Sequence, residues 1–167
     1  ILKSFKDIKN QEKDIKLILI MQILDKKYFE SINCYVKKNF KKDEVLFFHN
    51  VNKNLLKKFY RNALFYVFSS YCEVFGLTSL EAMKNKCPVL ISNRSALPEI
   101  NNKAAIYFDP KKVKDIKLKM KTLVKNPTLR KKLILRGKKH VKKFKWSNTL
   151  KNLMYIIEKK NNKQCIY

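Results

Sequence analysis

Two glutamates and a glycine stand at spacings that suit a ligand containing phosphate. Glu73 and Glu81 are separated by seven residues, and Gly76, one of only two glycines in the 167-residue chain, lies between them. An apolar-periodic stretch begins directly after Gly76, so a helix should start there. Its first N–H groups and the positive end of its dipole favour an anion. Glycine also permits a positive φ or the close approach of a ligand. The pattern therefore indicates an anion site that is best matched to phosphate.

The two carboxylates suggest what surrounds the phosphate. Side chains on a helix tilt toward its N-terminus, so the Glu81 side chain can reach back toward the anion site at the start of this helix. An ionised carboxylate only accepts hydrogen bonds, so both glutamates should accept from hydroxyl groups. A nucleotide sugar, with a diphosphate between two polyhydroxylated ends, fits this arrangement. Spacing alone also allows a second interpretation, in which Glu81 is an exposed helix residue paired with Lys84 and Glu73 is an ordinary loop acid.

The elements that must position these residues follow an alternating pattern. We expect strands at 16–21, 45–49, 64–69, 88–92 and 104–108, and helices at 26–40, 53–63 and 77–84. Continuous apolar strands separated by helices are typical of a parallel sheet covered on both faces. The sequence therefore predicts an α/β fold with a doubly wound parallel sheet, which is Rossmann-like. Ligands bind at the carboxyl ends of such strands, which is where Glu73 follows the strand at 64–69.

The strands stop at residue 111, and basic helices follow. We expect these C-terminal helices at 111–125, 129–144 and 147–160, with Asn126-Pro127 as a break and Ser147 as an N-cap. The opening residues already form an apolar-periodic segment that contains Ile1, Phe5 and Ile8. We therefore interpret the sequence as a piece of a longer protein.

The charge is strongly positive, with 39 basic residues against 13 acidic ones and a formal net charge of +26. One interpretation is a polyanionic partner, either nucleic acid or an anionic membrane surface. The other is a compositional preference for lysine. The lysines spread from Lys3 to Lys163 rather than forming one stripe, and lysine is poorer than arginine at bidentate recognition. Nucleic acid is therefore disfavoured, and a membrane surface stays open.

Cysteine and histidine usage gives no metal pattern. The four cysteines lack a C-x-x-C pair, and the two histidines complete no zinc motif with them. We expect reduced thiols and no metal site. Cys72 and Cys87, which flank the glutamate motif, are expected to be small buried apolar residues. No apolar run approaches the ~20 residues of a membrane-spanning helix.

A longer string of motifs resembles the retaining glycosyltransferases of family 4. Their signature is a pair of glutamates with seven residues between, here within E-V-F-G-L-T-S-L-E-A-M at 73–83. The matching motifs that follow are C-P-V at 87–89, L-P-E at 97–99, Y-F-D-P at 107–110 and F-K-W at 144–146. The resemblance covers about residues 1–150. It implies the nucleotide-binding C-terminal half of an enzyme with two Rossmann-like domains.

The resemblance implies an activity and residue roles. A sugar would be transferred from a nucleoside diphosphate sugar to a glycan or lipid-linked acceptor, with retention and without a metal or other cofactor. Glu73 would be catalytic and hold the donor-sugar hydroxyls, and Glu81 would hold the ribose hydroxyls. The diphosphate would bind the amides of Phe75, Gly76, Leu77 and Thr78. Asn50 and Val51 would lie near the base.

The resemblance also divides the chain and implies a location. Residues 1–145 would form the donor-nucleotide domain, whose first strand and N-terminal acceptor domain are missing, and 146–167 a C-terminal crossover helix with Trp146 at its hinge. Such enzymes act in polysaccharide or lipopolysaccharide biosynthesis. We expect a cytoplasmic location, with peripheral contact at the inner face of the membrane.

The sequence departs from the family pattern in ways that bear on activity. Lys86 stands where glycine is usual, and Val74 and Met21-Gln22 also depart from common glycine positions. The basic pair that neutralises the diphosphate in the family precedes the helix that opens this chain. The isolated chain is therefore expected to bind nucleotide weakly and to be inactive. The alternative function is a non-catalytic basic module on the same fold, which would bind a membrane surface or RNA.

Overall fold

The computed structural model describes residues 1–161 and confirms the alternation of strands and helices. The strands of this part of the chain are β1 (Leu17–Ile20), β2 (Val45–Phe48), β3 (Tyr66–Phe68), β4 (Val89–Ser92) and β5 (Ala105–Phe108). Its helices are α1 (Leu2–Lys9), α2 (Lys26–Asn39), α3 (Lys53–Asn62), α4 (Leu77–Lys84), α5 (Leu97–Asn101), α6 (Val113–Lys125), α7 (Pro127–His140) and α8 (Trp146–Asn161). Short 3₁₀ turns follow α5 at Asn102–Ala104 and α7 at Val141–Lys143.

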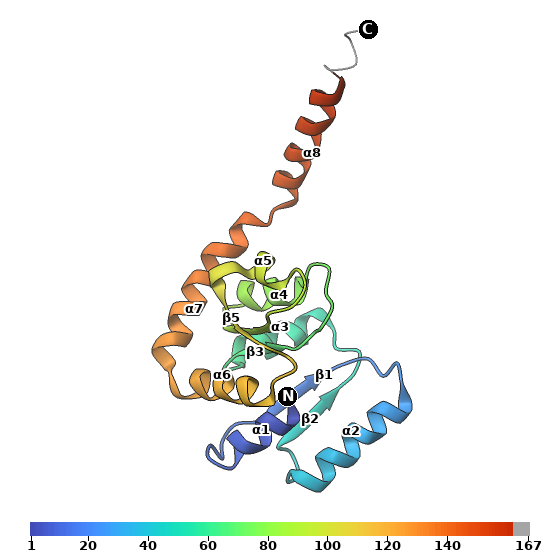
Figure 1. Cartoon of the computed structure of the whole chain (residues 1–167), viewed down its shortest axis with the longest axis vertical. Coiled ribbons are helices and arrows are strands. Elements are labelled where there is room, and N and C mark those ends of the chain that lie inside the picture. The colour runs from blue at the N-terminus through green and yellow to red at the C-terminus, as the bar shows by residue number, and fades with distance from the viewer. Residues whose placement is uncertain (162–167) are drawn as a thin grey trace.

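All pairings between strands are parallel, as expected, but the strands are divided between two sheets. β1 pairs with β2, with Leu17 opposite Val45. The second sheet has the order β3-β4-β5, in which Val89 lies opposite both Tyr66 and Ala105. Figure 1 shows β1 and β2 below the second sheet, together with α1 and α2. The α/β fold with parallel strands is therefore confirmed, and its sheet is interrupted between β1 and β3.

Helices cover both faces of the β3-β4-β5 sheet. Successive residues of a strand point to opposite faces, and β4 is buried on both. Leu90 packs into a core cluster with side chains from α1, α2 and α6, whereas Val89 and Ile91 pack into a second cluster with side chains from α3, α4 and α5. Burying an aliphatic side chain of this size contributes about 1.5–3 kcal/mol. This arrangement explains why β4 reads as a continuous apolar run in the sequence.

Helix α4 ends at Lys84, two residues before Lys86, where the sequence departs from a usual glycine. The Lys86 N–H donates to the Met83 carbonyl at 3.1 Å, and the Cys87 N–H donates to the Ala82 carbonyl at 3.0 Å. These two bonds form a Schellman motif, whose C′ residue adopts the left-handed conformation. Lys86 has a φ of 64°, a region that glycine enters without steric cost. The backbone here therefore favours glycine, although lysine is present.

Replacing Lys86 with glycine should stabilise the protein. We expect Lys86→Gly to raise the free energy of unfolding by about 1 kcal/mol, because the left-handed conformation costs roughly that much for a residue with a Cβ. Urea denaturation measures the change. Lys84→Gly is the matched control, since Lys84 has helical conformation in α4 and glycine there should destabilise by up to about 1 kcal/mol. A loss of stability in both variants would contradict the claim that the left-handed conformation of Lys86 lowers the stability of the protein.

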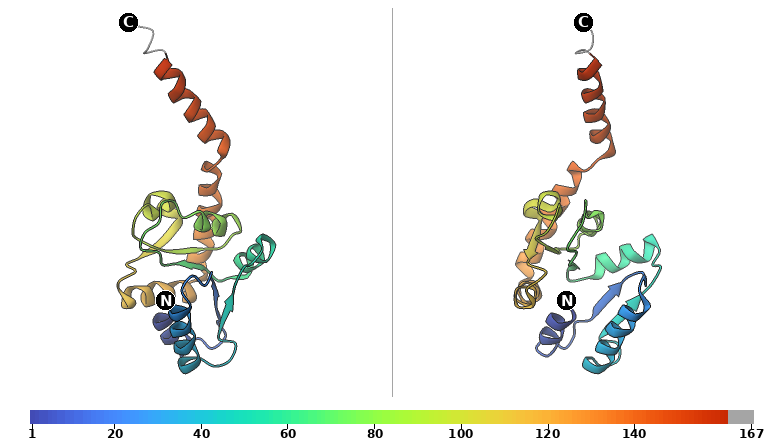
Figure 2. Two further views of the ribbon diagram at one scale, coloured as in Figure 1. Left: turned by 90° about the vertical axis from the view of Figure 1, so that its right-hand side faces the viewer. Right: turned by 45° about the vertical axis from the view of Figure 1, so that its right-hand side comes forward.

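The C-terminal helices differ from expectation at their starts. α7 begins at Pro127 rather than Leu129, because the Asn126 side chain accepts from the Leu129 N–H at 2.8 Å and proline suits a first helical position. α8 begins at Trp146, so the prediction of Ser147 as its N-cap was wrong. Figure 2 shows α8 extending away from the remaining elements, and Trp146 at its start is 89% exposed.

Candidate functional site

Gly76 is the N-cap of α4 and is required there by both conformation and space. Its φ of 79° and ψ of 46° place it in the left-handed region. A Cβ at this position would lie 2.6 Å from Cδ2 of Leu97, which is fully buried at the start of α5. Of the two expected roles of the glycine, the positive φ is confirmed. The close contact found here is with the Leu97 side chain, whereas the approach of a ligand stays a prediction.

The first turn of α4 leaves two backbone donors without an acceptor among the described residues. The Gly76 carbonyl accepts from both the Ser79 N–H at 3.0 Å and the Ser79 hydroxyl at 2.7 Å. Among the described residues, the N–H groups of Leu77 and Thr78 donate to no acceptor. Phe75, Leu77 and Thr78 are all exposed, and Leu77 is 64% exposed. Gly76 itself is buried. The unpaired N–H groups and the positive end of the helix dipole give this turn the chemistry of an anion site.

The two glutamates are on either side of this turn and carry no ion pair. Glu73 is half-buried, and its Cγ lies 3.6 Å from where a Cβ of Gly76 would be. Glu81 is exposed on α4. Within residues 1–161 the recorded ion pairs include neither carboxylate, so the pairing of Glu81 with Lys84 is not formed. Both carboxylates are free to accept hydrogen bonds from a ligand.

Two tyrosines hold the first turn of α4 and were not predicted from the sequence. The Tyr66 hydroxyl donates to Thr78 Oγ1 at 3.0 Å, and the Tyr60 hydroxyl donates to the Thr78 carbonyl at 3.4 Å. Burial raises the pKa of Tyr66 to about 12, and the nearby Glu81 and Glu73 carboxylates add to the rise. The charges of both carboxylates therefore act on the Tyr66 hydroxyl and help to keep it protonated. Tyr66 thus stays a neutral hydrogen-bond donor.

A second loop comes close to Glu73 at the same edge of the sheet. The Ala96 N–H donates to the Glu73 carbonyl at 3.4 Å, which joins the segment before α5 to the loop after β3. Arg94, in that segment, pairs with Asp109 at 3.2 Å. Hydrogen bonds from the Lys111 N–H and Arg94 lower the pKa of Asp109. The carboxyl ends of β3, β4 and β5 therefore form one connected rim.

The residues expected near the base lie in the other sheet. Asn50, with a φ of 52°, and Val51 follow β2, and the neighbouring His49 Nδ1 lies 3.0 Å from the Met21 carbonyl. In the described part of the chain, no hydrogen bond joins Asn50 or Val51 to residues 73–81. The structure thus brings together Glu73, Glu81 and the turn from Phe75 to Thr78. Asn50 and Val51 follow a strand of the other sheet, and their contact with the base stays a prediction.

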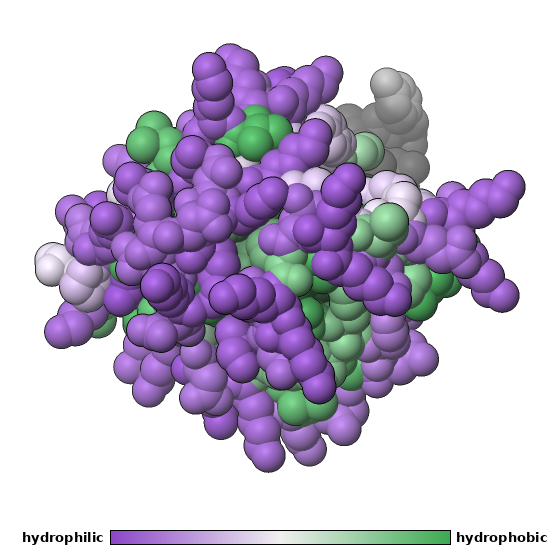
Figure 3. Space-filling model, turned by 90° about the horizontal axis from the view of Figure 1, so that it is seen from below, coloured by the Kyte–Doolittle hydropathy of each residue, from purple (hydrophilic) through white to green (hydrophobic). Residues whose placement is uncertain are grey.

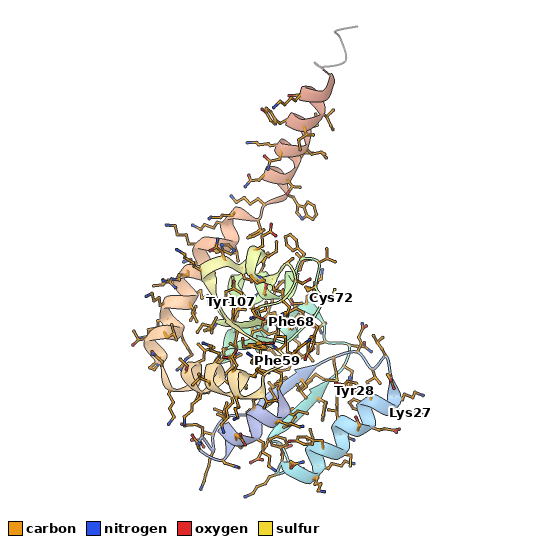
Figure 4. The ribbon with its side chains drawn as sticks, viewed as in Figure 1. Lys27, Tyr28, Phe59, Phe68, Cys72 and Tyr107 are labelled. Carbon is orange, nitrogen blue, oxygen red and sulfur yellow. The ribbon has the colours of Figure 1, made fainter. Side chains whose placement is uncertain are left out.

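The two cysteines beside the motif differ in exposure. Cys87 is 1% exposed, and burial raises the pKa of its thiol to about 12, so the expectation of a buried apolar residue is confirmed. Cys72 is exposed, so the same expectation was wrong for it. The reason is that Cys72 follows β3 by several residues and lies in the open loop beside α4, which Figure 4 shows.

Comparisons with known proteins agree with this picture. The family model described as "Glycosyl transferases group 1" matches residues 1–140. The O-antigen chain mannosyltransferase RfbU of Salmonella typhimurium is 38% identical over 69 residues, which are 41% of this chain and 20% of that protein. The O-antigen chain mannosyltransferase B of Escherichia coli is 35% identical over 89 residues, or 53% of this chain and 23% of that protein.

Solved structures of similar fold include a domain from a group 1 glycosyl transferase. The C-terminal domain of LpcC, a group 1 family glycosyl transferase from Francisella tularensis, has a TM-score of 0.75 and 25% identity over 84% of this chain and 75% of that one. Anabaena Alr3699/HepE, solved with UDP-glucose, has a TM-score of 0.74 and 13% identity over 84% of this chain and 40% of that one. The chain spans less than a quarter of the two curated mannosyltransferases. On these grounds the chain belongs to the group 1 glycosyl transferases.

Proposed function

We propose that this chain is the donor-binding half of a glycosyltransferase that takes a sugar from a nucleoside diphosphate sugar and retains its anomeric configuration. The observation that carries the proposal is the start of α4, where open N–H groups lie between two carboxylates without ion pairs. A diphosphate at the helix N-terminus has the hydroxyl-rich parts of the donor on either side. The acceptor is a glycan or a lipid-linked molecule.

In this proposal each part of the donor is bound by different residues. The N–H groups of Leu77 and Thr78 bind the diphosphate and stabilise the negative charge that grows on it as the sugar leaves. Glu73 accepts hydrogen bonds from the donor sugar and fixes its position. Glu81 accepts from the ribose hydroxyls. The helix dipole supplies positive potential at the leaving group, so we infer that transfer requires no metal.

The donor sugar is proposed to be a hexose. Mannosyltransferases among the relatives make mannose the first sugar to test, and the UDP-glucose complex of Alr3699/HepE shows that a protein of this fold binds a nucleotide sugar. Asn50 and Val51 remain our proposal for contacts to the base. The base itself is tested by comparing uridine, guanosine and adenosine diphosphates.

The location is proposed to be cytoplasmic, with peripheral contact to an anionic membrane surface. No helix in residues 1–161 is both long enough and apolar enough to cross a bilayer. The net charge of +26 would attract anionic lipid, and hydrophilic side chains cover most of the face shown in Figure 3. Nucleic acid is not part of the proposal.

The thiol of Cys72 provides a direct test, because it lies one residue before Glu73 and is exposed. We expect a nucleoside diphosphate at about 10 mM, enough for a millimolar dissociation constant, to slow alkylation of Cys72 several-fold. Peptide mass spectrometry follows each thiol separately. Cys34, exposed on α2, is the matched control and should react at an unchanged rate. Equal alkylation of Cys72 with and without each of the three nucleotides would count against the proposal.

A further inference from the structure

Helix α7 presents a basic outer face. Residues 127–145, which form α7, the 3₁₀ turn after it and the two residues that follow, contain nine Lys and Arg residues and no Asp or Glu. They therefore carry +9 of the chain's formal net charge of +26. The recorded ion pairs of residues 1–161 include none of these side chains. The charge of this surface is therefore positive throughout.

The arginines and lysines of this helix point in different directions. Arg130 donates to the Val124 carbonyl at 2.7 Å, and Arg136 donates to the Lys103 carbonyl at 3.4 Å, so both arginines bind the protein's own backbone. The exposed lysines recur every three or four residues and therefore share the outer face of the helix. They are Lys131, Lys132, Lys138, Lys139 and Lys142. Figure 1 shows α7 at an outer edge of the molecule, so these lysines face solvent together.

An apolar side chain lies in the middle of this face. Leu135 is 69% exposed and has lysines one helical turn away on either side. On the opposite side of the helix, Leu133 is 3% exposed and fills the core. The neighbouring helix α6 repeats the pattern, because its Leu118 is 59% exposed and also lies one turn from lysines. The surface thus combines positive charge with exposed leucine.

This combination favours an anionic bilayer over other polyanions. Lysine is a hydrated point charge, so it binds phosphate without the bidentate geometry that base recognition uses. A leucine can enter the boundary between lipid headgroups and acyl chains, whereas a nucleic-acid backbone offers it no apolar layer. Each lysine near an anionic membrane surface strengthens binding roughly fivefold. Five lysines on one face therefore give an affinity that vesicle assays can measure.

The basic face ends beside the candidate site. Beyond the last turn of α7, Phe144 packs edge-on against Phe75, with ring centroids 6.0 Å apart. His140 Nε2 lies 2.7 Å from the Ile100 carbonyl in α5. Phe75 directly precedes Gly76, the N-cap of α4. A bilayer against α7 would therefore lie close to the turn that binds the donor in the proposed function.

We propose that the outer face of α7 docks on an anionic bilayer, with Leu135 inserted into the headgroup layer and the start of α4 held near the membrane surface. A lipid-linked acceptor would then approach the donor by moving within the bilayer. This inference rests on the membrane contact and the acceptor class of the proposed function. Its test contains no nucleotide, so its failure and a failure of donor binding are distinguishable.

The test measures binding of the chain to phosphatidylcholine vesicles with and without about 30% phosphatidylglycerol, at about 0.15 M salt. The variant on α7 combines Lys131→Gln, Lys138→Gln and Lys142→Gln. We expect it to bind the anionic vesicles at least roughly tenfold more weakly than the unchanged chain. Far-ultraviolet circular dichroism reports that it is folded.

The matched control combines Lys37→Gln, Lys38→Gln and Lys41→Gln, at exposed positions in and after α2. It removes the same charge at another place on the surface. Charges that do not touch the bilayer are screened beyond about 8 Å at this salt, so binding should change less than about threefold. Equal losses in the two variants would contradict the proposal, because binding would then follow total charge.

Leu135→Gln tests insertion separately from charge. We expect several-fold weaker binding, because an apolar side chain no longer enters the bilayer. Leu24→Gln, at a position that is 92% exposed before α2, should leave binding unchanged. Lysine acetylation followed by mass spectrometry needs no variant. Anionic vesicles should slow the reaction of Lys138 several-fold and leave that of Lys37 unchanged.

Three further outcomes would contradict the proposal. The first is the absence of binding to anionic vesicles, and the second is binding that does not depend on the phosphatidylglycerol content. The third is tighter binding to single-stranded RNA than to vesicles at the same salt, lost in the α7 variant, because this face would then be a nucleic-acid surface.

Discussion

Gly76→Ala is expected to lower the free energy of unfolding by about 2–5 kcal/mol. A left-handed residue with a Cβ costs about 1–2 kcal/mol, and forcing a methyl group into a packed contact costs about 1–3 kcal/mol. The methyl group would meet Cδ2 of Leu97 at 2.6 Å, and Leu97, at the start of α5, is fully buried and cannot move aside freely. Urea denaturation at neutral pH measures the loss.

Gly137 provides the control, because it is the chain's other glycine and lies in the helical backbone of α7. A Cβ there would approach Cγ and Cβ of Met83 at 3.0 and 3.1 Å, which is a milder contact than the 2.6 Å at Gly76. Alanine also gains about 1 kcal/mol over glycine in a helix interior, which offsets the crowding. We therefore expect Gly137→Ala to be nearly neutral. Equal stability of the two variants would show that Gly76 is not needed for the turn before α4.

Glu81→Gln should weaken nucleoside diphosphate binding about tenfold or more without destabilising the fold. A hydrogen bond to a charged group is worth about 1.5–3 kcal/mol, which corresponds to roughly ten- to hundredfold in affinity. Glu81 is exposed and carries no ion pair in the described residues, so stability should change by less than about 0.5 kcal/mol. Calorimetric titration and urea denaturation measure the two quantities separately.

This substitution also separates the two functions that the sequence allowed. A basic module that binds membranes or RNA would bind slightly more tightly once a negative charge is removed. Glu30→Gln, at an exposed position on α2, removes the same charge away from α4 and is the matched control. A loss of nucleotide affinity in Glu81→Gln alone supports the glycosyltransferase proposal. Equal small gains for anionic vesicles in both variants would favour the basic module.

The part of the site that could be predicted from the sequence is the part that is local in the chain. Glu73, Gly76 and the first turn of α4 lie within a few residues of one another, so the strand-to-helix pattern was enough to place them. The strands were predictable because β4 is buried on both faces, β3 and β5 pack into the same two core clusters, and all three read as continuous apolar runs. The helix at Leu97–Asn101 was not predicted, since five residues show no clear periodicity.

Features that depend on tertiary packing were not predictable. The contact of Tyr66 with Thr78 joins residues twelve positions apart through the packing of β3 against α4. The exposure of Cys72 depends on how far its loop extends from β3. The interruption of the sheet is invisible in the apolar pattern, because β1 and β3 read as buried strands whatever lies beside them. Each of these facts is set by neighbours that lie far away in the sequence.

The central claim is that a nucleoside diphosphate binds at the start of α4, and the most direct test is an NMR titration of the amide groups with UDP, GDP and ADP to about 10 mM. We predict the largest shifts at the Leu77 and Thr78 amides, together with smaller shifts at Glu73 and Glu81, for at least one of the three nucleotides. Inorganic sulfate at matched ionic strength should not reproduce the full set. Shifts spread evenly over the lysine-bearing surface, with none at Leu77 and Thr78, would contradict the claim.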